Sequence, residues 1–335
     1  MKAPIVSVFM AAYNAEEFIE GSINSILNQS FKDFELIIVN DGSTDQTVAI
    51  VEQIKDPRIK LVHNPKNIGL QATRNRLLDL ATGKYIAILD SDDIASTDRL
   101  ETQVSFLENH SNIALCGGHA DVIDENHQFT GIRYIQPCDE TLETFMLFGN
   151  PFINSTVLFR TEVFLELKGY RDYAPAEDFD LFVRIAANHK IANLDKTLVK
   201  YRIHQSNVSK TENHLQLKNE NRILENLRVD LGLTSNDHTS AVHLSIYKGT
   251  FDRFSFKDYS EFLIQLKRAN RQTGRYDQEI LDKFLFNKWF KIIREKKAKN
   301  AILLLFNKAL FNWKYVTLKQ LRKTFKQSFF LNLSH

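Results

Sequence analysis

Apolar runs alternate with amphipathic stretches along the first hundred residues of this chain. Runs of consecutive apolar residues predict four buried strands, at residues 5–10, 35–40, 59–62 and 85–89. After the first run, apolar side chains recur at helical spacing on one face: Phe18, Ile19, Ile23, Ile26 and Leu27. This alternation predicts an α/β fold with a mostly parallel sheet and helices on both faces. Such sheets bind ligands at the carboxyl ends of their strands, so we expect the site there.

The pattern then becomes mixed, and it predicts helices near residues 99–109 and 177–188 and a strand near residues 114–118. The last third of the chain has mainly helical periodicity, with no internal repeat and no Gly/Pro-rich linker. A chain of 335 residues exceeds the usual size of one domain. We therefore expect a catalytic domain over residues 1–211 and a mainly helical, basic region over residues 212–335.

The composition is that of a soluble globular protein, with 43% hydrophobic and 25% charged residues. Two cysteines, Cys116 and Cys138, can build neither a disulfide framework nor a clustered thiolate metal site, which indicates a reducing compartment. The first residues leave no room for a signal peptide, and the apolar run at residues 301–306 is far below the roughly 18 residues of a spanning helix. We therefore expect a cytoplasmic protein.

Charge is distributed unevenly along the chain. From Lys283 onward, 13 Lys and Arg residues oppose a single acidic residue, Glu295, so this tail carries +12 while residues 1–282 carry −10. A basic, aromatic-rich tail indicates an anionic partner. No nucleic-acid-binding motif accompanies the charge, so we do not expect nucleic acid to be that partner.

One part of the tail resembles an interfacial helix. Four apolar residues share a helical face among several lysines: Phe286, Trp289, Phe290 and Ile293. Anionic lipid would attract the lysines while the apolar face enters the membrane surface, so we expect peripheral binding to the inner face of the cytoplasmic membrane. The alternative is an ordinary helical subdomain with a solvated basic face.

Three carboxylates follow the fourth apolar run, at Asp90, Asp92 and Asp93. Like charges crowded at a strand end are unfavourable unless a cation or hydrogen-bond donors neutralise them. Oxygen ligands suit Mg²⁺ or Mn²⁺, which keep coordination positions open for substrate phosphates. The alternative is a solvated acidic turn in which Asp93 or Ser96 caps the next helix.

Asp41 follows the second apolar run, with Gly42 next to it. A carboxylate at a strand end can accept hydrogen bonds from a base N–H or a ribose hydroxyl, although turn formation and capping of a helix that begins near Asp45 would use the same residue types. The chain has no GxGxxG and no GxxxxGK[ST] motif. A nicotinamide-type Rossmann site and a P-loop therefore lack their phosphate cradles.

Several separated segments resemble one family when they are taken together. They are residues 4–8 with Tyr13-Asn14, residues 29–45, Asn67-Ile68-Gly69, Arg74-Asn75, residues 81–93 and residues 176–181. Over roughly the first 210 residues they resemble the nucleotide-sugar glycosyltransferases of family 2. The resemblance implies the GT-A fold, which has a mostly parallel central sheet flanked by helices, here with a helical C-terminal extension.

The resemblance also implies roles for residues on the donor side. In this family the early tyrosine and the strand-end aspartate hold the nucleotide base, which assigns Tyr13 and Asp41 to that role, with simple packing as the alternative for Tyr13. The DxD-type motif implies that Asp90 binds ribose and that Asp92 binds the metal. Arg74 is a candidate diphosphate contact, because guanidinium matches phosphate oxygens, with a surface ion pair as the alternative.

Two further residues complete the predicted site. Glu177 and Asp178 open a helical stretch whose dipole favours the ionised form, and in related inverting enzymes the second acid of this pair is the catalytic base, here Asp178. Glu177 is then a supporting residue, and helix capping is the alternative for the pair. His204 resembles the histidine that closes the catalytic core in many GT-A enzymes, which implies a metal or diphosphate contact, with a structural role as the alternative.

The implied reaction is a metal-dependent displacement that inverts the anomeric carbon of a nucleotide-sugar, a UDP-sugar in our prediction. The segment from Cys138 to Arg160 resembles the acceptor side of β-1,3 hexosaminyl- and galactosyltransferase-like members. The predicted acceptor is a glycan or lipid-linked saccharide in bacterial surface polysaccharide or lipooligosaccharide synthesis. The alternatives are a transferase acting on protein or teichoic acid, and a catalytically silent nucleotide-sugar-binding or membrane scaffold protein.

Overall fold

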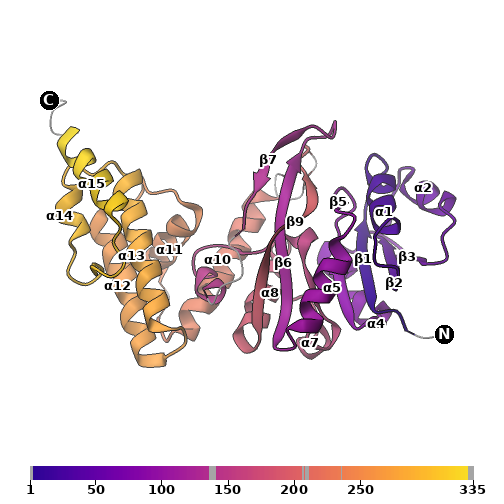
Figure 1. Cartoon of the computed structure of the whole chain (residues 1–335), viewed down its shortest axis with the longest axis horizontal. Helices are drawn as coiled ribbons and strands as arrows, with labels where there is room; N and C mark the ends of the chain where they lie inside the picture. The colour runs from indigo at the N-terminus through magenta and orange to yellow at the C-terminus, as the bar shows by residue number, and fades with distance from the viewer. Residues whose placement is uncertain (1–2, 136–140, 206, 208–210, 235, 331–335) are drawn as a thin grey trace. The chain divides into compact units, whose positions relative to one another are not determined.

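The computed structural model describes residues 3–135, 141–205, 207, 211–234 and 236–330. Cys138 and residues 208–210, next to the predicted domain boundary, lie outside the described residues. The chain divides into two compact units: Met1–Leu142 with Asn150–Glu220, and Glu143–Gly149 with Asn221–His335 (Figure 1). The assignment of residues 1–211 to catalysis stays a prediction.

Nine strands among the described residues form one sheet in the first unit. Their bounds are β1 Val6–Ala12, β2 Phe34–Asn40, β3 Ile59–His63, β4 Tyr85–Ile88, β5 Ile94–Ala95, β6 Ile113–Ile123, β7 Phe129–Arg133, β8 Leu158–Arg160 and β9 Lys190–Arg202. The order is β3-β2-β1-β4-β8-β6-β9-β5, and β7 pairs with β6. The four predicted strands are thus confirmed, and the strand predicted near residues 114–118 is part of the longer β6.

The direction of the strands brings their carboxyl ends together. Strands β1 to β4 are mutually parallel, β8 runs antiparallel to both β4 and β6, and β6 is parallel to β9. Because β8 reverses the direction on both of its sides, β1 to β4, β6 and β9 all run the same way. The segments that follow these strands therefore lie along one edge of the sheet, where parallel sheets bind ligands.

Helices flank this sheet in the first unit. They are α1 Ile19–Leu27, α2 Thr47–Gln53, α3 Leu70–Asn75, α4 Leu77–Leu80, α5 Arg99–Asn109, the 3-10 turn η1 Asn154–Thr156, α7 Thr161–Glu166 and α8 Glu177–Asn188. Alternate residues of β1, at Val6, Val8 and Met10, are buried in one core cluster together with Ile23 of α1 and Leu100 of α5. The period-2 pattern of the strand and the 3.6-residue pattern of the helices produce this packing. The α/β fold class predicted from the sequence is confirmed.

The second unit is helical in its described part. Its helices are α6 Leu142–Phe145 and α10 Asn213–Asp230, both of which begin in the first unit, α11 Asp237–Lys248, α12 Phe256–Thr273, α13 Gln278–Glu295, α14 Ala301–Leu305 and α15 Leu318–Phe330. Helix α12 begins with a capping box, in which Ser255 and Asp258 satisfy each other's backbone N–H groups. No helix in the described part of the chain is both long and apolar enough to span a membrane.

The prediction that the apolar face at Phe286, Trp289, Phe290 and Ile293 meets a membrane is wrong. Phe290 is partly buried and the other three side chains are fully buried, and the indole N–H of Trp289 donates to the carbonyl oxygen of Leu304 at 2.8 Å. Lys288, on the same helix α13, is half-buried over the ring of Phe148, and burial lowers its pKa to about 8. This helix is the core of an ordinary helical subdomain, because neighbouring helices cover its apolar face.

Gly42 makes a close approach of two loops possible at the carboxyl end of β2. Its backbone has a φ of +75°, and a Cβ atom there would lie 2.7 Å from the backbone nitrogen of Asn67. Only glycine adopts this conformation without strain and leaves the space free. Gly42 therefore allows the loop after β3 to lie against the loop after β2.

Replacing Gly42 with alanine is expected to lower the free energy of unfolding by about 1–3 kcal/mol, because the new Cβ meets backbone atoms in a left-handed conformation. The matched control is Gly21→Ala in helix α1, where a Cβ atom meets nothing within 4 Å. That change is expected to be neutral or to stabilise by up to about 1 kcal/mol. Urea titration measures both, and equal stability of the two variants would contradict the packing described for Gly42.

Candidate active site

The carboxylate of Asp41 holds the loop that follows β3. Its Oδ1 accepts hydrogen bonds from Asn64 Nδ2 at 2.8 Å and from the backbone N–H of Ile68 at 2.9 Å, and its Oδ2 accepts from the N–H of Gly69 at 3.0 Å. A carboxylate has about four lone-pair sites, so about one remains on Oδ2 for a further donor. The helix that follows, α2, has Gln46 at its N-cap and no side-chain cap, so the capping part of the alternative is wrong.

Tyr13 stands at the carboxyl end of β1, next to these loops. The neighbouring Asn14 receives a hydrogen bond from the N–H of Thr44 at 2.9 Å and donates its own N–H to Ser43 Oγ at 3.0 Å. These bonds join the loop after β1 to the loop after β2. Tyr13 itself is 50% exposed, so its ring is available to a ligand and simple core packing is excluded.

The three carboxylates after β4 have different surroundings. Asp90 accepts hydrogen bonds from Asn154 Nδ2 at 3.1 Å, from Ser155 Oγ at 3.0 Å and from the guanidinium of Arg74 at 2.9 Å. Its side chain is nevertheless about one-third exposed. Asp90 is therefore fixed in orientation by three donors while part of it remains open to a ligand.

Asp92 lies beside His204, as expected for two ligands of one metal. Oδ2 of Asp92 is 2.8 Å from Nε2 of His204 and accepts a hydrogen bond from Asn207 Nδ2 at 3.3 Å. The two residues are 112 positions apart in the sequence, and the antiparallel pairing of β5, which begins two residues after Asp92, with the last part of β9 brings them together. His204 also lies against the ring of Phe18, with ring centroids 5.0 Å apart.

Asp93 points away from solvent. Its Oδ1 accepts the backbone N–H of Arg202 at 2.7 Å, and its Oδ2 has no hydrogen-bond partner among the described residues. Burial, with the charges of Asp92 and Asp90, raises the pKa of Asp93 well above its usual range. Helix α5 begins at Arg99 without a side-chain cap, so the alternative of a solvated, helix-capping turn is wrong.

Arg202 is a site residue that the sequence analysis missed. Its buried guanidinium donates to the carbonyl oxygens of Asp92 at 2.8 Å and Asp124 at 3.1 Å, and it lies 4.6 Å from the ring centre of Phe18. It thereby ties the turn after β4 to the end of β9, just before His204. The sequence signal that could have identified Arg202 is the presence of an arginine inside a buried strand.

Arg74 links the turn after β4 to the start of α8. One terminal nitrogen donates to Asp90 Oδ1 at 2.9 Å and the other to Glu177 Oε1 at 2.6 Å. Burial alone would lower the pKa of Arg74, but the charges of Asp90 and Glu177 outweigh it and raise the pKa above its ordinary value. Arg74 does form ion pairs, but they are buried, so the alternative of a surface ion pair is wrong.

Asp178 has an unusual acidity for an aspartate. Burial and the neighbouring charge of Glu177 raise its pKa to about 7, against the opposing effects of Arg74 and of the hydrogen bond from the N–H of Phe179 at 2.7 Å. These effects outweigh the helix dipole, which we expected to favour the ionised form. Helix α8 has no side-chain cap, so the capping alternative is also excluded.

Contacts between distant segments position several of these residues, and the sequence analysis did not predict these contacts. Asn75 exchanges two hydrogen bonds of 2.8 Å with the backbone of Tyr170, and its neighbour Arg74 reaches Glu177. Asn154 and Ser155, in a segment quoted for its family resemblance, hold Asp90. The Arg74-Asn75 pair in the sequence was therefore the available signal for a link between α3 and the approach to α8.

Among the residues that the structure describes, no group of three or more His, Cys, Asp or Glu side chains forms a metal cage. Asp92 and His204 form a pair, and an oxygen with an imidazole nitrogen is a donor set that suits Mn²⁺. Both side chains are partly exposed, so a metal held there keeps positions for a ligand. The residues present therefore fit a divalent metal bound jointly by protein and substrate.

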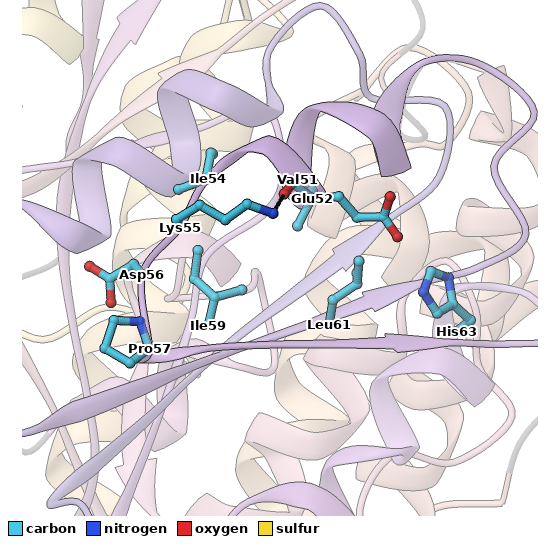
Figure 2. Close-up of a pocket in the computed structure, with 9 residues that line it drawn as sticks. All are labelled: Val51, Glu52, Ile54, Lys55, Asp56, Pro57, Ile59, Leu61 and His63. Atoms are coloured by element: carbon cyan, nitrogen blue, oxygen red, sulfur yellow. Dashed lines mark hydrogen bonds between the residues drawn. The ribbon is translucent and has the colours of Figure 1, made fainter.

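A surface hollow of about 790 Å³ lies elsewhere, between α2 and the edge strand β3 (Figure 2). Its lining combines apolar and charged side chains: Val51, Glu52, Ile54, Lys55, Asp56, Pro57, Ile59, Leu61 and His63. None of the predicted site residues lines it, so we do not assign it to the candidate active site.

Comparisons with solved structures show the same fold. Residues 1–349 of TarS from S. aureus, in complex with UDP-GlcNAc, match with a TM-score of 0.56 and 19% identity over 98% of this chain and 92% of that one. The mannosyltransferase PcManGT from Pyrobaculum calidifontis, in complex with GDP-Man and Mn²⁺, matches with a TM-score of 0.55 and 14% identity over 98% and 88%. Both likenesses confirm the GT-A fold.

Sequence comparisons identify closer relatives. A protein of Haemophilus influenzae named as an uncharacterized glycosyltransferase is 37% identical over 233 residues, which cover 66% of this chain and 72% of that protein. The UDP-Glc:alpha-D-GlcNAc-diphosphoundecaprenol beta-1,3-glucosyltransferase WfgD of Escherichia coli is 32% identical over 207 residues, or 61% of this chain and 79% of that enzyme. Residues 7–166 match the family described as Glycosyl transferase family 2. Through these matches and the carboxylates at its strand ends, the chain belongs to glycosyltransferase family 2.

Proposed function

We propose that this glycosyltransferase uses a divalent metal and a UDP-sugar to extend a glycan or lipid-linked saccharide in bacterial surface polysaccharide synthesis, with inversion at the anomeric carbon. The observation that carries the proposal is the buried Arg74, which holds Asp90 on the donor side and Glu177 beside Asp178 within one ion-pair network. In this proposal Arg74 thus supports both the donor side and the general base. Residues 1–211 are the catalytic domain in this proposal.

The donor side would bind the nucleotide through the loops at the carboxyl ends of β1 and β2. Tyr13 offers a half-exposed ring for the base, and the remaining lone pair of Asp41 can accept a base N–H. Asp90 would accept from ribose hydroxyls. The choice of a UDP-sugar is supported by the name of the E. coli relative and by the TarS complex with UDP-GlcNAc.

Asp92 and His204 are the residues that would hold the metal. A bound divalent cation neutralises the charge that builds on a departing diphosphate. Asp93 and Arg202 keep the two candidate ligands together, since Asp93 accepts the N–H of Arg202 and Arg202 donates to the carbonyl oxygen of Asp92. The Mn²⁺ in the PcManGT structure supports this choice of cation. Arg74 stays the candidate diphosphate contact, because its two hydrogen bonds to carboxylates use two of the five N–H donors of its guanidinium.

Asp178 would act as the general base. A base with a pKa of about 7 is about half ionised at neutral pH and accepts a proton from a hydroxyl more readily than an ordinary aspartate. It would take the proton of the acceptor hydroxyl as that oxygen attacks the anomeric carbon. Glu177 supports it by raising its pKa and by anchoring Arg74.

The acceptor in our proposal is presented at the cytoplasmic face of a membrane. The E. coli relative is named for an acceptor linked to diphosphoundecaprenol, which is a membrane lipid. The basic tail would bring the enzyme to such a surface as a peripheral protein. A transferase for protein or teichoic acid remains the alternative within enzymes, and a silent nucleotide-sugar-binding scaffold is the alternative outside them.

The Asp178→Asn variant separates an enzyme from a scaffold. It is expected to bind the UDP-sugar as the parent does, because Asp178 is assigned to the acceptor, but to lose turnover at least about 100-fold. Thermal shift over a panel of UDP-, GDP- and dTDP-sugars with Mn²⁺ identifies the donor, and sugar transfer is then followed by release of the nucleoside diphosphate. The control is Asp172→Asn, an exposed acid of the same segment. Equal turnover of Asp178→Asn and its parent would refute the assignment of the base.

The pH dependence of kcat/KM should show an acid limb with a midpoint near pH 7. Asp178 must be ionised to act as a base, so activity falls as pH drops through its pKa and is retained above it. Glu177→Gln removes the neighbouring negative charge, which lowers the pKa of Asp178 and moves this limb to lower pH. Glu108→Gln, an exposed acid on α5, should leave it in place. A shift to higher pH in Glu177→Gln would disprove the electrostatic account.

Chelation should abolish transfer if the metal assignment holds. Excess EDTA is expected to remove activity and Mn²⁺ to restore it, while Asp92→Asn should require a higher Mn²⁺ concentration. Mn²⁺ binding followed by electron paramagnetic resonance gives a readout independent of activity. The exposed Asp98→Asn serves as control. Undiminished turnover in excess EDTA would refute the assignment of Asp92 and His204 as metal ligands.

A further inference from the structure

Helix α15 packs against its own unit with a polar face. Thr324 is fully buried, and its hydroxyl donates to the carbonyl oxygen of Gln320 at 2.8 Å. Gln327 is buried too, and its side-chain amide donates to the carbonyl oxygens of Ile293 at 3.0 Å and Ala298 at 3.1 Å. Arg294 of α13 in turn donates to Gln327 Oε1 at 2.9 Å. Hydrogen bonds to α13 and to the segment after it therefore anchor this helix.

The opposite face of α15 exposes large apolar side chains. Leu318 is 74% exposed, Phe325 is 54% exposed and Phe329 is 65% exposed. Their spacing of seven and four residues puts them within one narrow stripe, because each residue advances by about 100° around a helix. An amphipathic helix of a soluble domain normally buries such a stripe, whereas α15 buries its polar face and displays the apolar one.

Basic residues lie along one side of this stripe. Lys319, Arg322, Lys323 and Lys326 are all exposed, and α15 contains no acidic residue. At about 100° per residue the four fall together on one flank of the helix, with Arg322 nearest to the stripe. The exposed surface of α15 thus combines an apolar stripe with a basic band, and we call this combination the α15 face.

We propose that the α15 face docks on an anionic membrane surface. The apolar stripe would enter the boundary between headgroups and acyl chains, and the basic band would lie against lipid phosphates. A second copy of this chain fits less well, because a two-fold contact would bring the same basic bands together. The inference rests on the proposed function, in which the acceptor is lipid-linked, and it replaces α13, whose apolar face is buried, as the membrane-contacting helix.

The test is co-sedimentation of the full-length chain with lipid vesicles. Vesicles of phosphatidylcholine alone are compared with vesicles that also contain phosphatidylglycerol. Binding is expected only with the anionic lipid, and it should weaken as salt screens the basic band. Leu318→Ser with Phe325→Ser is expected to weaken partitioning at least about tenfold, and Lys319→Gln with Arg322→Gln and Lys323→Gln should do the same.

The matched control is Val229→Ser, which removes an apolar side chain that is 57% exposed on α10. It should leave vesicle binding unchanged. Circular dichroism and thermal unfolding of each variant show whether the fold is retained, which is expected because the replaced side chains lie on the exposed face. Anionic vesicle binding that the Leu318→Ser, Phe325→Ser variant leaves intact would overturn the proposal. So would the absence of vesicle binding together with a concentration-dependent dimer that this variant abolishes.

Failure of the proposed function has a different signature. Slow hydrolysis of the donor in the absence of membrane reports on the catalytic unit and should be equal in the parent and in the α15 variants. Loss of vesicle binding with donor hydrolysis retained supports the assignment of the α15 face. Vesicle binding by a chain that hydrolyses no nucleotide-sugar would leave the membrane surface established and the proposed function refuted.

Discussion

A single buried guanidinium determines how the parts of the candidate site are arranged. Arg74 lies between Asp90, at the end of β4, and Glu177, at the start of α8. Removing one partner from a buried ion pair costs about 3–5 kcal/mol, because the remaining charge stays in a poorly solvated place. Arg74, Asp90 and Glu177 therefore depend on one another, and the turn after β4 cannot move independently of α8. Through this network the donor side and the proposed base keep a defined relation.

The same network determines the acidity of Asp178. The charge of Glu177 adds to the rise that burial causes in the pKa of Asp178, and the smaller opposing effect of Arg74 limits that rise. A carboxyl group with a pKa of about 7 is the outcome of these opposed effects. The arrangement that holds α8 in place is thus also the one that adjusts its chemistry, and the two roles of Glu177 cannot be changed separately.

Local pattern was enough to predict most of the first unit, because a buried parallel sheet needs long apolar runs and flanking helices need 3.6-residue periodicity. The pairing of Asp92 with His204, 112 positions apart, was implied by the family resemblance and not by a local pattern. What sequence could not supply were contacts across long separations. Arg202 holds the Asp92 turn from 110 residues away, and Arg74 reaches Glu177 across 103. No local pattern encodes such a partner.

The two tail helices show why an amphipathic pattern does not by itself identify a membrane surface. Helix α13 has an apolar face among lysines, yet α14 and its neighbours cover that face, and the indole of Trp289 bonds to α14. Helix α15 is less apolar overall, but its apolar side chains are exposed. Its packed face carries the polar residues Thr324 and Gln327, whose side chains form hydrogen bonds there. Periodicity defines a face, and only tertiary packing decides whether that face is used for folding or is left for a partner. The exposed aliphatic and aromatic side chains of α15 are therefore better evidence for a docking surface than the covered apolar face of α13.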